Sequence, residues 1–137
     1  MGDVIVNEHE VAFARFLKTG SSSRYVQLSK TPRGREKWVQ GLAHFDPSNL
    51  EERFARPLPD AARTAATVAA LLERRGAPEV CWVMSEDRDF DASELPLRDA
   101  LDEFHGRLCG VVLSCVPGRL AYLETEDMHR FILERPT

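Results

Sequence analysis

The chain has 137 residues, of which 43% are hydrophobic and 29% charged, and its formal net charge is −4. This length suits a single domain covering residues 1–137, and such a fold buries roughly two-thirds of the surface of the unfolded chain. The apolar fraction excludes global disorder and a collagen-like fibre, and no apolar run approaches the ~20 residues of a membrane-spanning helix. We therefore expect a soluble globular protein without a membrane partner.

Two features of the sequence bear on its compartment. The first residues lack the basic and apolar stretches of a secretory signal. The three cysteines (Cys81, Cys109 and Cys115) form an odd set within apolar runs, which is typical of buried, reduced thiols. We therefore expect a cytoplasmic protein. Abundant Ala and Arg with little Lys is the bias of a GC-rich bacterial genome.

Charge is distributed unevenly along the chain. Residues 12–40 carry seven basic side chains and one acid, a local net charge of +6, whereas residues 79–137 carry thirteen acids and six arginines, a local net charge of −7. Two explanations follow from this polarity. The basic and acidic segments pair within the molecule, or a basic surface faces a partner.

The first half of the sequence predicts helices. A helix capped by Asn7, with Glu10 three residues later, is expected to stop at Gly20 before a serine loop at 21–23. The segment 25–28 fits either a strand or a helix. The pair Thr31-Pro32 begins another helix, because proline suits the first helical position.

Further signals define the centre of the chain. Asp46-Pro47 repeats the helix-start signal, and residues 56–59, with two prolines, predict a stiff connector. The alanine-rich stretch 60–75 predicts the strongest helix, capped by Asp60 and ended by Gly76 and Pro78.

The second half predicts strands alternating with helices. Residues 80–84 are apolar throughout, as in a buried strand, and an acidic loop, 85–95, follows them. Pro96 is expected to open a helix carrying Leu97, Leu101, Phe104 and Leu108. Residues 109–116 and 120–123 predict two strands joined by a Pro-Gly turn. A last helix is expected, capped by Thr125 and bearing Met128, Phe131 and Ile132.

This order of elements predicts an α+β fold with α/β-like character. The helical N-terminal half would pack on a small mixed sheet, followed by a C-terminal β-α-β-β-α unit. Within that unit the first two strands should be parallel and joined by a right-handed crossover.

The acidic loop is the first candidate site, because loops that leave the carboxyl ends of strands often bind ligands. Asp87, Asp89 and Asp91 match positions 1, 3 and 5 of a calcium loop, but Ala92 and Arg98 occupy the positions that require Gly and Glu. Magnesium demands fewer protein ligands, so Glu86, Asp87 and Asp89 are candidate Mg²⁺ ligands, with Glu124 as a further oxygen donor. The alternatives are a solvated loop and a protein contact.

The basic segment 24–37 is the second candidate site. Its anion-binding candidates lie beside the predicted helix start: Lys30, Arg33, Arg35 and Lys37. They could contact phosphates, and a helix N-terminus offers free N–H groups to an anion. A sequence pI near 5.6 argues against a dedicated nucleic-acid domain. The alternatives are a solvated face and a partner for the acidic half.

No pattern assembles a catalytic set from the remaining reactive residues. Cys115 and His129 could meet as a nucleophile and base, but Cys115 more simply packs as a small apolar residue. Zinc-ligand spacing, a nucleophile elbow and a phosphate loop are absent from the sequence.

The leading hypothesis is therefore a non-catalytic accessory module that binds another protein, with homo-oligomerisation left open and no cofactor. The first alternative is a Mg²⁺-dependent phosphodiesterase or phosphatase that uses the acidic residues 86–91. The second alternative is a nucleic-acid accessory protein that uses residues 24–37.

Overall fold

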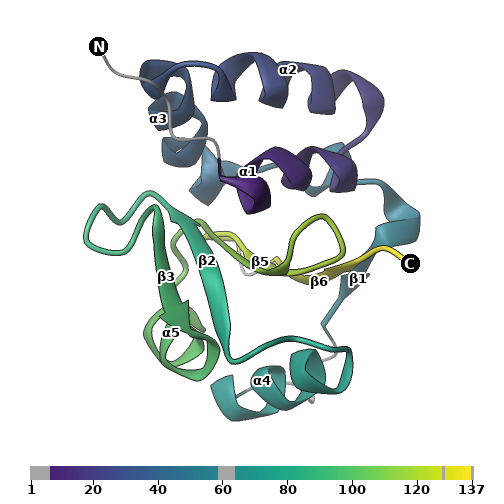
Figure 1. Cartoon of the computed structure of the whole chain (residues 1–137), viewed down its shortest axis with the longest axis vertical. Helices are drawn as coiled ribbons and strands as arrows, with labels where there is room; N and C mark the ends of the chain where they lie inside the picture. The colour runs from purple at the N-terminus through teal and green to yellow at the C-terminus, as the bar shows by residue number, and fades with distance from the viewer. Residues whose placement is uncertain (1–6, 59–63, 128, 137) are drawn as a thin grey trace.

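The computed structural model describes residues 7–58, 64–127 and 129–136. Its centre is a six-stranded antiparallel sheet with the order β1-β6-β5-β4-β2-β3. Helices α1, α2 and α3 cover one face of this sheet, and α4 and α5 cover the other (Figure 1). The α+β class with an N-terminal helical half is thus confirmed.

The helices follow local signals in the sequence. Asn7 caps α1 by accepting hydrogen bonds from the N–H groups of His9 and Glu10, and Thr31 caps α3 through the N–H of Gly34. The helices are α1 (Glu8–Ala12), α2 (Thr19–Ser29), α3 (Pro32–Gln40), α4 (Ala65–Arg74) and α5 (Leu97–Phe104). Short 3-10 turns continue the first half: Phe13–Phe16, Leu42–His44, Pro47–Asn49 and Glu52–Phe54. We call the elements of residues 8–54 the helical layer.

The strands of the sheet lie mostly in the second half of the chain. They are β1 (Ala55–Pro57), β2 (Val80–Ser85), β3 (Ser93–Pro96), β4 (Val111–Val116), β5 (Leu120–Glu124) and β6 (Arg130–Glu134). The apolar run at 80–84 is the interior strand β2, as predicted, and the acidic loop leaves its carboxyl end.

The prediction that the strands at 80–84 and 109–116 are parallel is wrong, and so is the prediction of a mixed sheet. β2 and β4 pair antiparallel, with Val83 opposite Leu113. The cause is β3, a short strand within the segment expected to be loop. The N–H of Ala92, at φ 57°, donates to the carbonyl of Val83 and closes a β2–β3 hairpin. This hairpin reverses the chain before α5, so α5 leads back into an antiparallel strand.

The expected last helix is also wrong. Phe131 and Ile132 lie in β6, which pairs with β5 on one side and with β1 on the other. The N–H of Thr125 donates to the carbonyl of His129 and closes the β5–β6 turn instead of capping a helix. Met128 lies outside the described residues.

Several element boundaries differ from the predictions. Gly20 and the serines at 21–23 lie inside α2, and α4 begins at Ala65 with Thr64 as its cap. The proposed cap Asp60 lies outside the described residues. Arg56 and Pro57 of the expected connector lie in edge strand β1, which ends at Pro57. α5 ends at Phe104, and Leu108 is 40% exposed beyond it.

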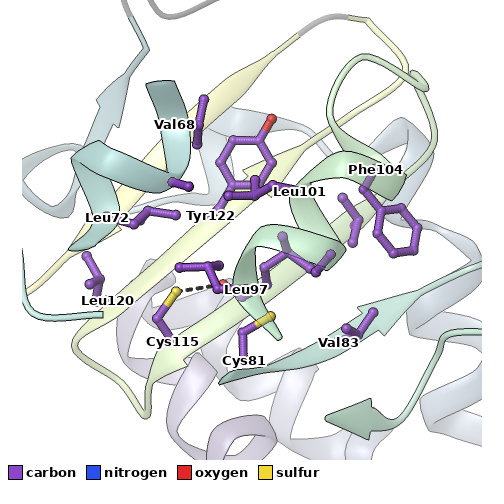
Figure 2. Packing of buried hydrophobic residues seen from close by; sticks show 14 of the residues in the cluster. Val68, Leu72, Cys81, Val83, Leu97, Leu101, Phe104, Cys115, Leu120 and Tyr122 are labelled. Carbon is purple, nitrogen blue, oxygen red and sulfur yellow. Dashed lines mark hydrogen bonds between the residues drawn. The ribbon is translucent and has the colours of Figure 1, made fainter. Parts of the chain in front are cut away.

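Two cores occupy the two faces of the sheet. The α4–α5 core brings Val68 and Leu72 of α4 and Leu101 of α5 against strand residues such as Val83 and Tyr122 (Figure 2). The helical-layer core joins Phe13, Phe16, Tyr25 and Leu42 to Met84, Val112 and Leu123 of the sheet. Because side chains alternate along a strand, the four interior strands β2, β4, β5 and β6 supply both cores.

Candidate functional site

The acidic loop is tied to its neighbours by its own carboxylates. The Glu86 carboxylate accepts a hydrogen bond from the N–H of Gly110 at 3.1 Å. One Asp87 oxygen lies 2.9 Å from the Arg107 guanidinium, and the other accepts from the N–H of Asp89 at 3.0 Å. These contacts hold the loop after β2 against the connector between α5 and β4.

The Mg²⁺ ligands proposed from the sequence are thus partly engaged by protein groups. Glu86 and Asp87 point to Gly110 and Arg107, and the Asp89 residue is exposed. Within residues 7–58, 64–127 and 129–136, His, Cys, Asp and Glu form no group of three that could hold a metal ion. The Mg²⁺ site stays a prediction without support from this geometry.

Glu124, the further candidate ligand, is fully buried at the end of β5. Its carboxylate accepts hydrogen bonds from the Tyr122 hydroxyl at 2.7 Å and from the N–H groups of Gly106 and Leu108. Arg130 supplies a counter-charge, with its Nε 3.3 Å from Oε1. Burial, together with the Glu124 charge, raises the pKa of Tyr122. This cluster fastens the 105–110 connector to the sheet.

Arg35 is the one predicted anion-binding residue that faces the interior. Its guanidinium forms two hydrogen bonds to Glu10 and two to Asp91, at distances of 2.7 to 2.9 Å. The hydrogen bond to Asp91 is the largest cause of a raised Arg35 pKa, so the group stays charged. Glu10 also accepts from Nε1 of Trp82 at 2.8 Å. Arg35 therefore joins α1, α3 and the acidic loop.

The other predicted anion-binding residues have no ionic partner within the described part of the chain. Lys30, Arg33 and Lys37 are exposed, as is Arg24 on α2. None of the four forms an ion pair with any residue that the structure describes. We call these four residues the basic surface. Internal pairing of the basic and acidic segments is thus limited, on the basic side, to Arg35.

A pocket lies next to the basic surface, and sequence reasoning missed it. It is an open hollow with a volume of about 530 Å³, lined by residues of α2, α3 and the segment 41–49. Its lining is Leu17, Ser21, Arg24, Tyr25, Leu28, Lys37, Trp38, Gly41, His44, Phe45, Asp46 and Asn49. Arg24 and Lys37 belong both to the lining and to the basic surface. A sequence signal that could have indicated it is a set of three adjacent basic–aromatic pairs, at 24/25, 37/38 and 44/45, all of which line the pocket.

The reactive side chains are placed differently from the proposed Cys–His pair. Cys115 packs in the α4–α5 core, whereas His129 is exposed and stacks near Phe131. Instead, Nδ1 of His9 lies 2.8 Å from the Ser114 hydroxyl. Ser114 is only 2% exposed, so this pair fastens α1 to β4 and has little access to a substrate. Burial lowers the pKa of His9, which favours the neutral ring.

The cysteines are free thiols, as expected. Cys81 and Cys115 are buried in the α4–α5 core (Figure 2), and Cys109 is half-buried. Burial raises the pKa of Cys81 to about 12, and it also raises the pKa values of Cys109 and Cys115. Because the thiolate is the reactive form, these positions suit packing more than nucleophilic chemistry.

Comparison with known proteins places the chain in no family: no family model, no curated protein and no solved structure matches it. In the described part of the chain, no helix has the length and apolar character needed to cross a membrane.

Proposed function

We propose that this chain is a non-catalytic module that binds another protein, and that the basic surface of α2 and α3 docks against an acidic surface of that partner. One observation carries the proposal. Arg24, Lys30, Arg33 and Lys37 are exposed, and none pairs with a described carboxylate.

The rest of the molecule makes that observation informative. Five arginines of the second half lie within ion-pair distance of carboxylates: Arg75, Arg88, Arg98, Arg107 and Arg130. The basic surface is distinguished by its grouping, because four cations without an ion pair to a described residue lie on α2, on α3 and at Lys30 between these helices. Complementary charge accelerates the encounter of two proteins and disfavours wrong partners, so unpaired cations grouped on one layer suit recognition.

Nucleic acid is the second candidate, and the same cations favour it. Domains dedicated to nucleic acid are usually basic overall, whereas this chain has a formal net charge of −4 and confines its unpaired cations to one layer. Arg35, one of the four residues first considered for phosphate contact, is already occupied by Glu10 and Asp91. These points favour a protein partner.

The Mg²⁺-dependent phosphodiesterase or phosphatase has the weakest support, because Glu86 and Asp87 already bind protein groups. A titration with MgCl₂ followed by amide NMR shifts checks it. Saturable shifts confined to residues 86–91 would revive this function. Unchanged shifts there would remove it.

Poly-L-glutamate serves as the first probe of the proposed docking. We expect saturable binding at low salt that weakens as the ionic strength rises to about 150 mM, where exposed charges are screened beyond roughly 8 Å. The double variant Arg24→Glu, Lys37→Glu should bind at least about tenfold more weakly, because two attractive contacts become repulsive.

The control is Arg74→Glu, an exposed arginine on α4 that forms no ion pair with a described residue and lies on the other side of the sheet. It changes charge in the same direction at a distant site and should leave binding nearly unchanged. Equal losses in the control and the double variant would contradict the proposal. So would a single-stranded oligonucleotide that binds more tightly than poly-L-glutamate at every salt concentration.

A further inference from the structure

The floor of the 530 Å³ pocket is a preformed aromatic surface. The Trp38 ring meets Tyr25 edge-on at 4.7 Å and Phe13 at 5.4 Å between ring centroids. Tyr25 is 3% exposed, and its hydroxyl donates to the Glu10 carbonyl, which fixes the ring. A rigid floor loses little conformational entropy when a ligand covers it.

Trp38 and Phe45 are the half-buried members of this floor. Both pack against the helical-layer core and both line the pocket, so each residue has surface in the core and surface on the pocket. Partly covered aromatic rings gain free energy when another apolar group completes their burial. A pocket of this kind at the centre of an interface is where a partner's anchor residue binds most strongly.

The rim of the pocket is polar and carries uncompensated positive charge. Arg24 and Lys37 have no ion-pair partner among the described residues. The other ionisable groups of the lining are His44 and Asp46, and the charged Asp46 carboxylate opposes one of the two positive charges, which leaves a net charge of +1 with His44 neutral. His44 Nδ1 lies 2.6 Å from Glu126, and the Asp46 carboxylate accepts from the N–H of Ser48, which lowers the pKa of Asp46. The rim therefore favours carboxylates over cations.

We infer that the pocket binds an aromatic or large aliphatic side chain of the partner protein, flanked in the partner's sequence by Asp or Glu residues. This inference rests on the proposed function and specifies where the partner is anchored. The side chain covers Trp38 and Phe45, and the flanking carboxylates lie beside Arg24 and Lys37. Both charge-assisted pairs form at the edge of a buried apolar contact, which gives the docking a fixed position.

Two short peptides of equal charge test the inference. Each consists of glutamates around one central residue, which is Phe in the first peptide and Ala in the second. We expect the Phe-centred peptide to bind at least about tenfold more tightly, the effect of roughly 1.4 kcal/mol of added apolar burial.

The two tryptophans provide a built-in readout by NMR. The Trp38 ring lines the pocket, whereas Nε1 of Trp82 is held by Glu10 at 2.8 Å and Trp82 does not line the pocket. We expect the Phe-centred peptide to shift the Trp38 indole signal and to leave the Trp82 signal nearly unmoved. Equal shifts of both signals would contradict anchoring in this pocket.

A pair of truncations on the helical layer adds a matched control. Phe45→Ala removes part of the pocket lining, whereas Val26→Ala removes apolar surface from a residue of α2 that is 42% exposed and outside the pocket. The preference for Phe over Ala should vanish in the first variant and persist in the second. The peptide comparison on the unaltered protein stands by itself if Phe45→Ala does not fold.

The possible failures can be told apart. If both peptides bind equally, the basic surface binds acidic chains and the pocket inference is wrong. If neither peptide binds and poly-L-glutamate also fails, the proposed function is wrong. If a single-stranded oligonucleotide shifts Trp38 and the Phe-centred peptide does not, a nucleobase is the occupant and the inference is overturned.

Discussion

The two faces of the sheet are built from different chemistry. The α4–α5 core is a cluster of apolar side chains, with Val68, Leu72 and Leu101 fully buried. The opposite face combines an apolar core with buried and half-buried polar contacts. Examples are the hydrogen bond between His9 and Ser114 and the ion pairs of Arg35 with Glu10 and Asp91. The first face is stabilised mainly by apolar packing, with the Tyr122–Glu124 cluster at its edge, whereas the second has polar contacts between the helical layer and the sheet.

This difference separates stability from recognition. Hydrophobic packing is non-directional, so α4 and α5 need only apolar surface of suitable shape. Arg35 has a directional guanidinium, and its two carboxylate partners fix how α3 sits over the sheet. The pocket and the basic surface lie on this second side, where orientation is set most strictly. The following predictions test that division.

The largest effect is expected for Leu101→Ala in the α4–α5 core. Leu101 is 0% exposed, and removing its side chain leaves a cavity. We expect a loss of about 3 kcal/mol in the free energy of unfolding, measured by urea denaturation. Binding of poly-L-glutamate by the folded fraction should not change. A lower affinity of the folded fraction would contradict the separation of the two faces.

Gly110→Ala tests the contact between the sheet and the helical layer. A Cβ at Gly110 would lie 2.2 Å from the backbone nitrogen of Ala43, which cannot move freely. We expect a loss of about 2–3 kcal/mol in urea denaturation. Gly20→Ala is the control, because a Cβ there meets nothing within 4 Å and Gly20 lies in α2. That change should raise stability by about 0.5–1 kcal/mol.

Arg35→Met tests the polar fastening. It leaves the Glu10 and Asp91 carboxylates without their shared cation, so we expect a loss of about 2 kcal/mol. The estimate stays below the range for fully buried pairs because the Arg35 side chain is 18% exposed. Lys30→Met replaces an exposed residue of the basic surface and should change the free energy of unfolding by less than about 0.5 kcal/mol. An unchanged stability of Arg35→Met would assign the orientation of α3 to packing alone.

The smallest effect is a pH dependence from His9 and His105. Burial is the largest cause of a lowered pKa at both residues, so the unfolded chain binds protons before the folded chain does. The stability contributed by the neutral rings is present above pH 6.5, the ordinary value, and is lost as the pH falls below it. We expect the free energy of unfolding, measured by urea denaturation, to fall less with decreasing pH in His9→Gln and in His105→Gln than in the unaltered protein. A fall of the same size in both variants would locate its cause elsewhere.

Local signals predicted those elements whose causes lie within a few residues. The pair Thr31-Pro32 begins α3, and the apolar run at 80–84 is a strand inside the sheet. The spacing of Leu97, Leu101 and Phe104 marked the buried face of α5. In each case a cap, a proline or an apolar period acts locally, so the sequence carries the signal directly.

The prediction failed where a distant strand decided the local conformation. Residues 93–96 contain a single strongly apolar residue, Leu95, and become β3 because β2 offers an edge to pair with. Phe131 and Ile132 fit either a helix or a strand, and pairing with both β5 and β1 selected the strand. The α2 helix extends over the three serines at 21–23, which by themselves favour a loop.

The candidate sites divide in the same way. The segment 24–37 was identified as basic from its composition, and its charge is what the proposed function uses. Composition did not indicate that Arg35 alone turns inward or that Trp38 and Phe45 line one pocket. Glu86 and Asp87 were grouped as metal ligands from their spacing, but Gly110 and Arg107 lie against them in space.

The amino-acid order by itself determined the α+β class, the helix starts at Asn7 and Thr31, the interior strand β2 and the uneven charge along the chain. Only the tertiary structure decided the antiparallel sheet, the partners of the acidic loop and the pocket beside α2 and α3. The physical reason is the separation along the chain of the residues that interact. Caps, turns and apolar periods act over a few residues, whereas strand pairing, ion pairs and pockets depend on groups that approach one another only after the chain has folded.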